Sequence, residues 1–472
     1  MDVNNLDLEK LIIDHDDDQE VVIRMLTLNK CNANEWSNLV RLYEPSLHTI
    51  VDDKVRRKDK IKEGGLLEKA ARIHIGLEKL LVSRMVNFMF AIPVKRIYHY
   101  DEKNDKQKQI VNALERIYKH ARINRVNIER GKMLYAACEF FTFWYVVKAK
   151  HSLYGFESEY KVKCMNYSPM KGVDLYPLFD EYGDLKAMTF KSTIKKEDHE
   201  VKIVDTYTAN YHAKWKYDTS NDNGWVLETN EELLSINKIP GVYMLAPNPI
   251  YQDLDVFREE IEYKMSEGGD TIAYNSAPVI HVSGGIQGEE KKGESQRIIR
   301  TENGGSVSYV SWQQSIEAQK FHIETMHDLF FSMSQMADIS AAKMMGLGNI
   351  GFDARKTIFT DPHLKVGEES GAWGETFERE FNVLKAILGQ MNVEWQSEMD
   401  NIEAEHIITP FIQNEENTQI KNYMAANGGK PIISHLESIK LAGLSTNPES
   451  TLQAIQEDEA AANPLKNMFS EE

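Results

Sequence analysis

The sequence contains little cysteine, no long uninterrupted apolar segment and a shortage of basic residues. It has only three cysteines among 472 residues. Cys31, Cys138 and Cys164 lie far apart, so the spacing indicates neither a disulfide framework nor a zinc site. The longest apolar run, residues 133–147, includes Glu139 and is shorter than the roughly 20 residues of a membrane-spanning helix. The acidic N-terminus does not resemble a signal peptide. These absences predict a soluble protein made in a reducing cytoplasm, without a membrane partner.

The charge balance restricts the class of partner further. The chain has 55 Lys and Arg against 73 Asp and Glu, a formal net charge of −18. This excess of acid argues against a broad basic face that grips nucleic acid. It does not exclude a protein that must avoid sticking to nucleic acid.

Recognisable catalytic motifs are also absent from the sequence. No His-Glu-x-x-His, Gly-x-Ser-x-Gly or Cys/His pairing occurs, and no segment matches the phosphate-binding loop of nucleotide hydrolases. The acidic stretch 14–20 lacks the glycine and the spacing of a calcium-binding loop, which favours a solvated acidic surface. The sequence therefore predicts no catalytic residue, no metal site and no cofactor.

Three glycines, Gly346, Gly348 and Gly351, match the Gly-x-Gly-x-x-Gly pattern of a dinucleotide-binding turn. That turn follows a buried strand and opens a helix. Here the preceding residues have helical periodicity, and Pro362 leaves little room for a following helix. A permissive loop between two helices is the favoured interpretation, because glycine removes the steric barrier to positive φ.

The N-terminal half combines helical patterns with a β-rich region. Residues 1–60 are predicted to be mostly helical, and a further helical pattern covers 108–135. Residues 136–245 are rich in β-branched and aromatic residues that alternate as in strands. The segment 220–224 has the composition of a hairpin turn.

A long amphipathic helix is predicted over residues 66–90. Ile73, Ile75 and Met85 are among the apolar residues near helical spacing, and Pro93 marks the end of the segment.

The C-terminal half is predicted to contain three long helices, a short β region and a helical tail. The helices cover 251–276, about 314–338 and about 364–391. Their expected apolar faces comprise Leu254, Phe257, Ile261, Met265 and Ile272 in the first, Ile316, Ile323, Met326, Phe330 and Met333 in the second, and Trp373, Phe377, Phe381, Leu384, Leu388 and Met391 in the third. Residues 277–313 read as short strands with polar loops, and 395–411 read as one strand before an acidic helical tail.

A small basic cluster lies within the short β region. It consists of Lys291, Lys292, Arg297 and Arg300. A solvated loop and a contact with a partner protein are both compatible with this cluster.

Taken in order, five stretches resemble a portal protein of tailed bacteriophages, of the long-tailed-phage type. They are residues 71–94, 236–265, 270–285, 321–340 and 414–460. Together they follow the order of the family's motifs over most of 66–460. One departure is the sequence GFDARKT at 351–357, where many relatives have a Ser-Gly pair after the loop.

The resemblance implies an α+β, mainly helical, portal-type fold with named parts. These are a wing of N-terminal helices and a β-rich part (1–250), a stem helix (251–276), a small β clip (277–313), a second stem helix (314–342), a tunnel loop (343–362), a wing helix with a return strand (363–410) and a helical crown or tail (411–472).

The resemblance also implies a function. Portal proteins form a ring, usually dodecameric, at one capsid vertex of the virion, after synthesis in the host bacterial cytoplasm. The ring is the channel for packaging and ejection of double-stranded DNA, which it contacts without sequence preference. The implied protein partners are the terminase large subunit, head-completion or adaptor proteins, and the major capsid and scaffolding proteins. The chain is expected not to be an enzyme; another capsid or adaptor component, or a phage enzyme such as a nuclease, are the alternatives.

Two sets of contact residues follow from the resemblance. The tunnel loop is expected to face DNA through Lys343, Met344, Met345, Asn349, Arg355 and Lys356. The methionines offer soft, uncharged contacts, and the cations could touch phosphates transiently. The clip is expected to contact partner proteins through the basic cluster of Lys291, Lys292, Arg297 and Arg300, because a rigid scaffold commonly presents binding loops in this way.

Overall fold

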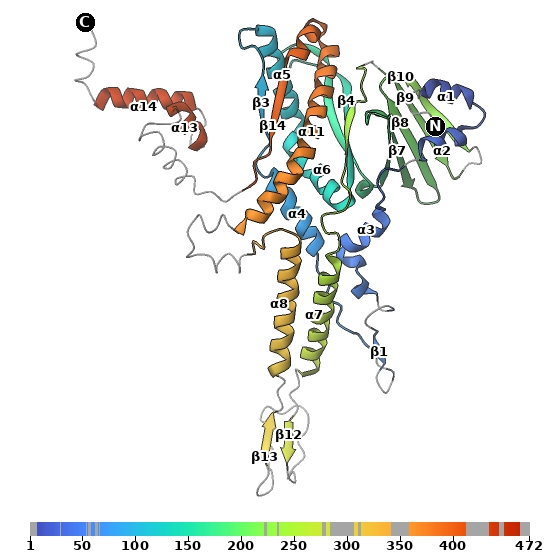
Figure 1. Ribbon diagram of the computed structural model, residues 1–472, viewed down its shortest axis with the longest axis vertical. Helices are drawn as coiled ribbons and strands as arrows, with labels where there is room; N and C mark the ends of the chain where they lie inside the picture. The colour runs from blue at the N-terminus through green and yellow to red at the C-terminus, as the bar shows by residue number, and fades with distance from the viewer. Residues whose placement is uncertain are drawn as a thin grey trace. The chain divides into compact units, whose positions relative to one another are not determined.

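Two compact units are formed by residues 1–411 and 412–472. The computed structural model contains helices and strands in the first unit and helices in the second (Figure 1). This mixture, with more helix than strand, confirms the α+β class expected from the sequence. The structure describes residues 7–28, 30–52, 54, 58–61, 65, 67–220, 224–233, 236–275, 280–283, 306–309, 313–340, 358–411, 434–442 and 448–462.

Short helices form the N-terminal region, as the sequence predicts. α1 (Leu8–Asp14) and α2 (Gln19–Leu26) each follow an aspartate whose side chain accepts a hydrogen bond from a backbone amide of the first turn. Such a cap satisfies an amide that has no partner within the helix. α3 (Trp36–Tyr43) comes next, followed by the 3₁₀ turns η2 (Pro45–Leu47) and η3 (Thr49–Val51).

The helix predicted over 66–90 begins only at Leu77, so the first part of that prediction is wrong. The helix α4 covers Leu77–Phe90. The residues before it are β1 (Lys60–Ile61), β2 (Leu67–Glu68), which pairs with β1, and an extended segment at 69–76. Backbone amides of this extended segment donate to side chains of another helix, as described below, and this explains why the local helical pattern is not followed.

A three-stranded antiparallel sheet has β4 (Glu139–His151) as its central strand. β4 pairs with β5 (Ser158–Tyr167) on one side and with β11 (Gly241–Leu245) on the other. A Cβ atom at Gly241 would lie 2.4 Å from the ring of Phe141. Glycine at this position therefore allows the close approach of β11 to β4.

A second antiparallel sheet has five strands in the order β10-β9-β8-β7-β6. α1 and α2 cover one face of it (Figure 1), and there the indole of Trp215 is fully buried and donates to Gln19 at 2.7 Å. The hairpin predicted at 220–224 is confirmed in position, because it connects β9 to the neighbouring strand β10. The strands are β6 (Val173–Phe179), β7 (Leu185–Lys195), β8 (Glu200–Thr208), β9 (Tyr211–Asp218) and β10 (Trp225–Glu232).

The helical pattern at 108–135 corresponds to two helices. α5 (Asp105–Ala121) and α6 (Ile123–Ala137) are separated by Arg122, whose φ of 55° places it in the left-handed region. A residue in that conformation ends the first helix and redirects the chain.

The third long helix is confirmed as α11 (Thr360–Met391), and it supplies much of the main core. Its buried apolar face contains Trp373, Phe377, Phe381, Leu384 and Leu388. Trp373 packs edge-on to Phe90 of α4 and stacks on Phe140 of β4, so this late helix completes a core that begins with the N-terminal region.

One buried ion pair lies inside this core. Arg130 of α6 donates to both carboxylate oxygens of Glu380 of α11, at 2.8 and 3.2 Å. The side chains are 0% and 1% exposed. Asn127 accepts a further hydrogen bond from Arg130, and Trp144 of β4 donates to Glu380. The pair therefore joins α6, α11 and β4 through charges that have no access to water.

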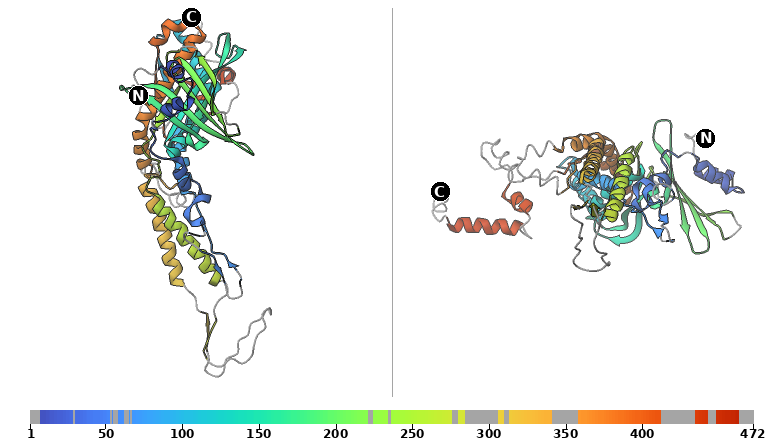
Figure 2. Two further views of the ribbon diagram at one scale, coloured as in Figure 1. Left: turned by 90° about the vertical axis from the view of Figure 1, so that its right-hand side faces the viewer. Right: turned by 90° about the horizontal axis from the view of Figure 1, so that it is seen from below.

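Two long helices, α7 (Asp255–Asn275) and α8 (Gln313–Met333), lie side by side (Figures 1 and 2). They are called the paired helices below. Both were expected from the sequence, but two residues assigned to their apolar faces are exposed: Ile272 at 65% and Met333 at 64%. The expected β region between them includes one antiparallel pair, β12 (Ile280–Ser283) and β13 (Ser306–Tyr309).

The strand predicted over 395–411 is shorter than expected. Residues Val393–Asn401 form the 3₁₀ segment η5, and only β14 (Glu403–Ile407) is a strand. It pairs with β3 (Lys95–His99). Within the second unit, α13 (His435–Ala442) and α14 (Pro448–Ala462) agree with the predicted helical tail. Among the described helices, none is both long and apolar enough to cross a membrane.

Candidate functional site at the base of the paired helices

The residues predicted to contact DNA and partner proteins lie outside the described part of the chain. Lys343, Met344, Met345, Asn349, Arg355 and Lys356 fall within 341–357, and Lys291, Lys292, Arg297 and Arg300 fall within 284–305. Their assignments therefore stay predictions. The described residues nearest to them in sequence belong to the paired helices, and the attachment of these helices to the N-terminal region is the candidate site.

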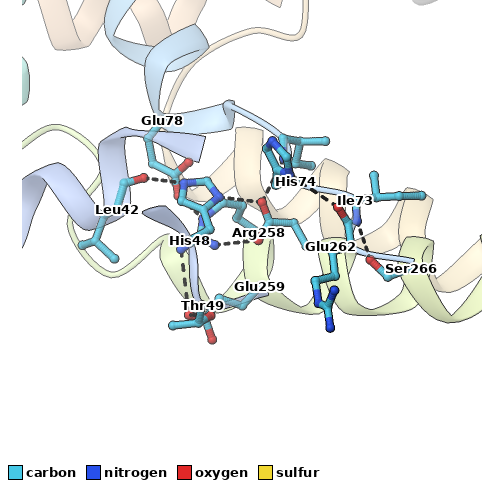
Figure 3. Close-up of polar contacts among 12 residues, drawn as sticks. Leu42, His48, Thr49, Ile73, His74, Glu78, Arg258, Glu259, Glu262 and Ser266 are labelled. Atoms are coloured by element: carbon cyan, nitrogen blue, oxygen red, sulfur yellow. Dashed lines mark hydrogen bonds and ion pairs between the residues drawn. The ribbon is translucent and has the colours of Figure 1, made fainter. Parts of the chain in front are cut away.

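The extended segment 70–76 runs along α7 and is called the strap. Alternate backbone amides of the strap donate to side chains of α7: Ala71 to Asp270 at 2.8 Å, Ile73 to Ser266 at 2.8 Å, and Ile75 to Glu262 at 2.9 Å. Figure 3 shows the contacts at Ser266 and Glu262. The three acceptors are spaced four residues apart along the helix.

The spacing of the donating amides in the strap matches the spacing of their acceptors on α7 because of backbone geometry. Two residues of an extended chain advance about 6.6 Å, and four residues of an α-helix advance about 6 Å. Every second amide of the strap therefore meets every fourth residue of α7, on a single face of the helix. The amides keep hydrogen bonds although they belong to no sheet, which removes the cost of leaving buried donors unpaired.

Adjacent glycines allow α7 to be approached on two sides. A Cβ atom at Gly269 would lie 3.4 Å from the Cβ of Ala71 in the strap, and one at Gly268 would lie 2.6 Å from the amide of Gln319 in α8. The side chain of Gln319 donates a hydrogen bond to the carbonyl of Lys264. The pair of glycines thus places α7 close to both the strap and α8.

A buried ion cluster holds the beginning of α7. It consists of His48, Glu78, Arg258 and Glu262, whose side chains are at most 1% exposed (Figure 3). Arg258 lies 2.6 Å from the carboxylate of Glu78 in α4 and 2.8 Å from that of Glu262. His48 lies 2.6 Å from Glu262. The cluster therefore connects α7 to α4 and to the turn that contains His48.

The environment shifts the pKa values of the cluster in different directions. Burial raises the pKa of Glu78, although the positive charge of Arg258 opposes this shift. Burial also acts to raise the pKa of Glu262, but hydrogen bonds from His48 and the amide of Ile75, with the charge of Arg258, outweigh it and lower the pKa. Both carboxylate oxygens of Glu262 have hydrogen-bond partners, whereas Oε2 of Glu78 has none among the described residues.

Both ring nitrogens of His48 have a hydrogen-bond partner. Nδ1 faces the carboxylate of Glu262 at 2.6 Å, and Nε2 faces the backbone carbonyl of Leu42 at 3.0 Å. The ring of His48 therefore joins the turn after α3 to Glu262 of α7.

The arrangement is suited to mechanical connection rather than to catalysis. Its carboxylates are bound by Arg258, His48 and backbone amides, and no nucleophile lies beside a base in the cluster. Among the described residues, no group of three or more His, Cys, Asp or Glu side chains could hold a metal ion. The site joins the paired helices to the N-terminal region through charges and backbone amides.

The helix α8 has several exposed apolar side chains. Phe321, Leu329 and Met333 of α8 are 72%, 38% and 64% exposed. They are separated by eight and four residues, so they lie on one face of the helix together with Thr325. We call this face the α8 stripe. Exposed large apolar residues that share one face are a common feature of interaction surfaces.

Sequence analysis did not identify the strap, the ion cluster or the α8 stripe as functional. The acceptors Glu262, Ser266 and Asp270 had a visible signal, because polar residues recur every four positions beside the apolar residues of α7. Their partner could not be inferred, since the strap itself has the periodicity of a helix. His48 and Glu78 carried no comparable signal.

Comparison with known proteins supports the family resemblance. The chain matches the sequence profile described as "Phage portal protein, SPP1 Gp6-like" over residues 12–465. No curated protein matches the chain significantly.

Three solved structures are similar to the chain at low identity. "Neck of native GTA particle computed with C12 symmetry" has 11% identity and a TM-score of 0.38, covering 90% of this chain and 99% of that chain. "Neck of empty GTA particle computed with C6 symmetry" has 10% identity and a TM-score of 0.36, covering 78% and 89%. "Virion of native gene transfer agent (GTA) particle" has 9% identity and a TM-score of 0.35, covering 90% and 99%.

The profile match spans nearly the whole sequence, and the five stretches described above follow the order of the same family's motifs. The chain therefore belongs to the SPP1 Gp6-like family of phage portal proteins.

Proposed function

We propose that the chain is the subunit of a portal ring at one capsid vertex of a phage virion. Double-stranded DNA is packaged and ejected through the central channel of this ring. Family membership supports the portal role. The α8 stripe is the observation that carries the ring, because a single chain leaves Phe321 and Met333 mostly exposed to water.

A second copy of the chain is the partner that the α8 stripe fits in this proposal. Neighbouring copies in a ring present different faces to each other, and such a heterologous interface closes when the rotation per subunit allows it. Val256 and Ile272 of α7, at 67% and 65% exposure, add exposed apolar side chains that a neighbouring copy can cover. Full burial of one large apolar side chain contributes roughly 1.5–3 kcal/mol.

The Phe321→Asp substitution is expected to reduce annular particles at least about tenfold relative to the wild-type chain. The physical reason is that an unpaired carboxylate would replace an apolar side chain at every interface of the ring. Native mass spectrometry and negative-stain imaging of the purified full chain give the stoichiometry and the fraction of rings.

Tyr182→Asp is the matched control, because Tyr182 is an aromatic residue with 81% exposure in the turn between β6 and β7. This variant should form rings as the wild-type chain does. A wild-type chain that stays monomeric at high concentration would overturn the portal proposal. Normal rings of the Phe321 variant would show instead that the interface lies elsewhere.

The parts of the ring are proposed from the same family membership. The paired helices are the stem, and 277–313 form the clip, which docks the terminase large subunit and head-completion or adaptor proteins. Residues 343–362 form the tunnel loop facing DNA. Residues 1–250 and 363–410 form the wing, which adjoins capsid and scaffolding proteins, and 411–472 form the crown.

Two sets of alanine substitutions test the contact residues assigned to the tunnel loop and to the clip separately. Replacing Lys343, Arg355 and Lys356 should lower DNA retention severalfold and weaken its salt dependence, because three phosphate contacts per subunit are removed. Replacing Lys291, Lys292, Arg297 and Arg300 should instead abolish terminase or adaptor binding. Filter retention of DNA and co-sedimentation with the partner proteins measure the two effects on intact rings. Equal behaviour of the two variants in both assays would contradict the assignments.

A further inference from the structure

The strap is bound far less deeply than the helix that follows it directly in the chain. In α4, the side chains of Leu81, Val82 and Met85 are 0% exposed. The apolar strap residues Ile73 and Ile75 are only partly buried. The contacts of the strap with α7 include three single hydrogen bonds to side chains and the approach of Ala71 and Ile73 to Gly269. Segments with few buried apolar contacts open locally before the rest of a protein unfolds.

The ion cluster would persist if the strap left α7. Glu262 loses the amide of Ile75 but keeps Arg258 and His48. Ser266 and Asp270 are neutral or partly exposed groups that water can solvate. Arg258 also keeps its bond to Glu78 in α4. The beginning of α7 would therefore stay attached to the N-terminal region while the helix beyond Glu262 lost its contacts with the strap.

The hydrogen bonds between α7 and α8 would stay intact if the two helices moved together. The side chain of Gln319 donates to the carbonyl of Lys264, and His322 lies 3.2 Å from Glu260. These bonds join one helix to the other and do not involve the strap. Release of the strap thus permits both helices to turn as a unit about their base, where Arg258 contacts Glu78 and where Phe330 and Phe331 of α8 are buried in the main core.

We propose that residues 70–76 are a releasable strap that sets the position of the paired helices, and that these helices move only when the strap leaves Glu262, Ser266 and Asp270. The proposal rests on the proposed portal function, because DNA passing through the channel would require that movement. The strap acts as a conformational lock that is built from backbone amides, with the ion cluster as the pivot.

A reversible crosslink tests this lock directly. The Ala71→Cys and Gly269→Cys substitutions place two Cβ atoms about 3.4 Å apart, close to the roughly 3.5–4.5 Å of a disulfide. The exposed Cys31 is replaced by serine in the same chain to prevent other disulfides. Oxidised rings should lose DNA packaging at least about tenfold, and reduction should restore it. The two single-cysteine variants, oxidised in parallel, should package normally.

Hydrogen exchange on assembled rings of the full chain provides a second readout. Strap amides should exchange much faster than those of α4, and Ser266→Ala should speed strap exchange about fivefold, which corresponds to one net hydrogen bond. Strap amides that exchange only with global unfolding would overturn the proposal, as would oxidised rings that package as well as reduced ones. Failure of the wild-type chain and the reduced variant to form rings would refute the portal function itself and is therefore a distinguishable outcome.

Discussion

Replacement of Arg258 by methionine is expected to lower the free energy of unfolding by about 3–5 kcal/mol. The substitution keeps an apolar stem of similar length but removes the charge that lies 2.6 Å from Glu78 and 2.8 Å from Glu262. Glu78 would become a buried carboxylate without a cation beside it, and Glu262 would keep only His48 and the amide of Ile75. Loss of one partner from a buried ion pair is costly because the other charge stays desolvated. Urea denaturation followed by circular dichroism, at one protein concentration, measures the change.

Arg379→Met is the matched control for this experiment. Arg379 also lies 2.6 Å from a carboxylate, that of Glu375, but both side chains are about half exposed or more, at 49% and 64%. An exposed pair of this kind contributes roughly 0–1 kcal/mol. Similar losses for the two variants would contradict the view that burial makes the Arg258 contacts important. A second variant, Arg258→Met combined with Glu78→Gln, should recover part of the lost free energy of unfolding. It also removes the buried negative charge of Glu78, which Arg258 no longer balances.

The Glu380→Leu substitution is expected to have an effect of similar size, about 3–5 kcal/mol, for a different reason. It leaves the guanidinium of Arg130 buried, with Asn127 as its remaining hydrogen-bond partner among the described residues. It also removes the acceptor for the indole of Trp144. Because this pair joins α6, α11 and β4, the loss should appear as unfolding of the main core rather than as release of the paired helices.

The double variant Arg130→Met and Glu380→Leu distinguishes a stranded charge from lost packing. Replacing both members of a buried pair by apolar residues of similar volume is often neutral or stabilising. We therefore expect the double variant to unfold at a higher urea concentration than Glu380→Leu alone. A double variant that is less stable than the single one would show that lost packing, rather than an unpaired buried charge, accounts for the destabilisation. The hydrogen-exchange rate of the strap amides should be unchanged in both the single and the double variant.

The long regular elements were predictable because their own side chains carry the signal. In α11, the residues expected on the apolar face include Trp373, Phe377 and Leu388, and all three are buried. The helix is 32 residues long, so its periodicity is repeated many times. The hairpin between β9 and β10 was similarly predictable, because the turn residues at 220–224 act locally.

Exposed positions on the paired helices were predicted less well. Ile272 and Met333 fit the periodicity of buried faces, yet both are mostly exposed. Periodicity identifies an apolar face but does not say whether the same chain or another copy covers it. Only the placement of α7 against α8 shows that these two residues are left exposed.

The candidate site depended on contacts that the sequence could not indicate. Ile73 donates its amide to Ser266 across 193 positions of the chain, and His48 reaches Glu262 across 214. Backbone amides are present at almost every position, so their choice of acceptor leaves no trace in composition. The ion cluster likewise joins residues from three separate segments.

By itself, the sequence determined the mixed helical and β-rich class, the order of the long elements and the family, because these depend on local periodicity and on motifs that keep their order. The tertiary structure decided where α4 begins and what the strap does. A helix over 69–76 would have formed only its own local hydrogen bonds. The extended strap instead gives its amides to Glu262, Ser266 and Asp270 of α7. Local propensity amounts to less than about 1 kcal/mol per residue, so partners from a distant helix can override it.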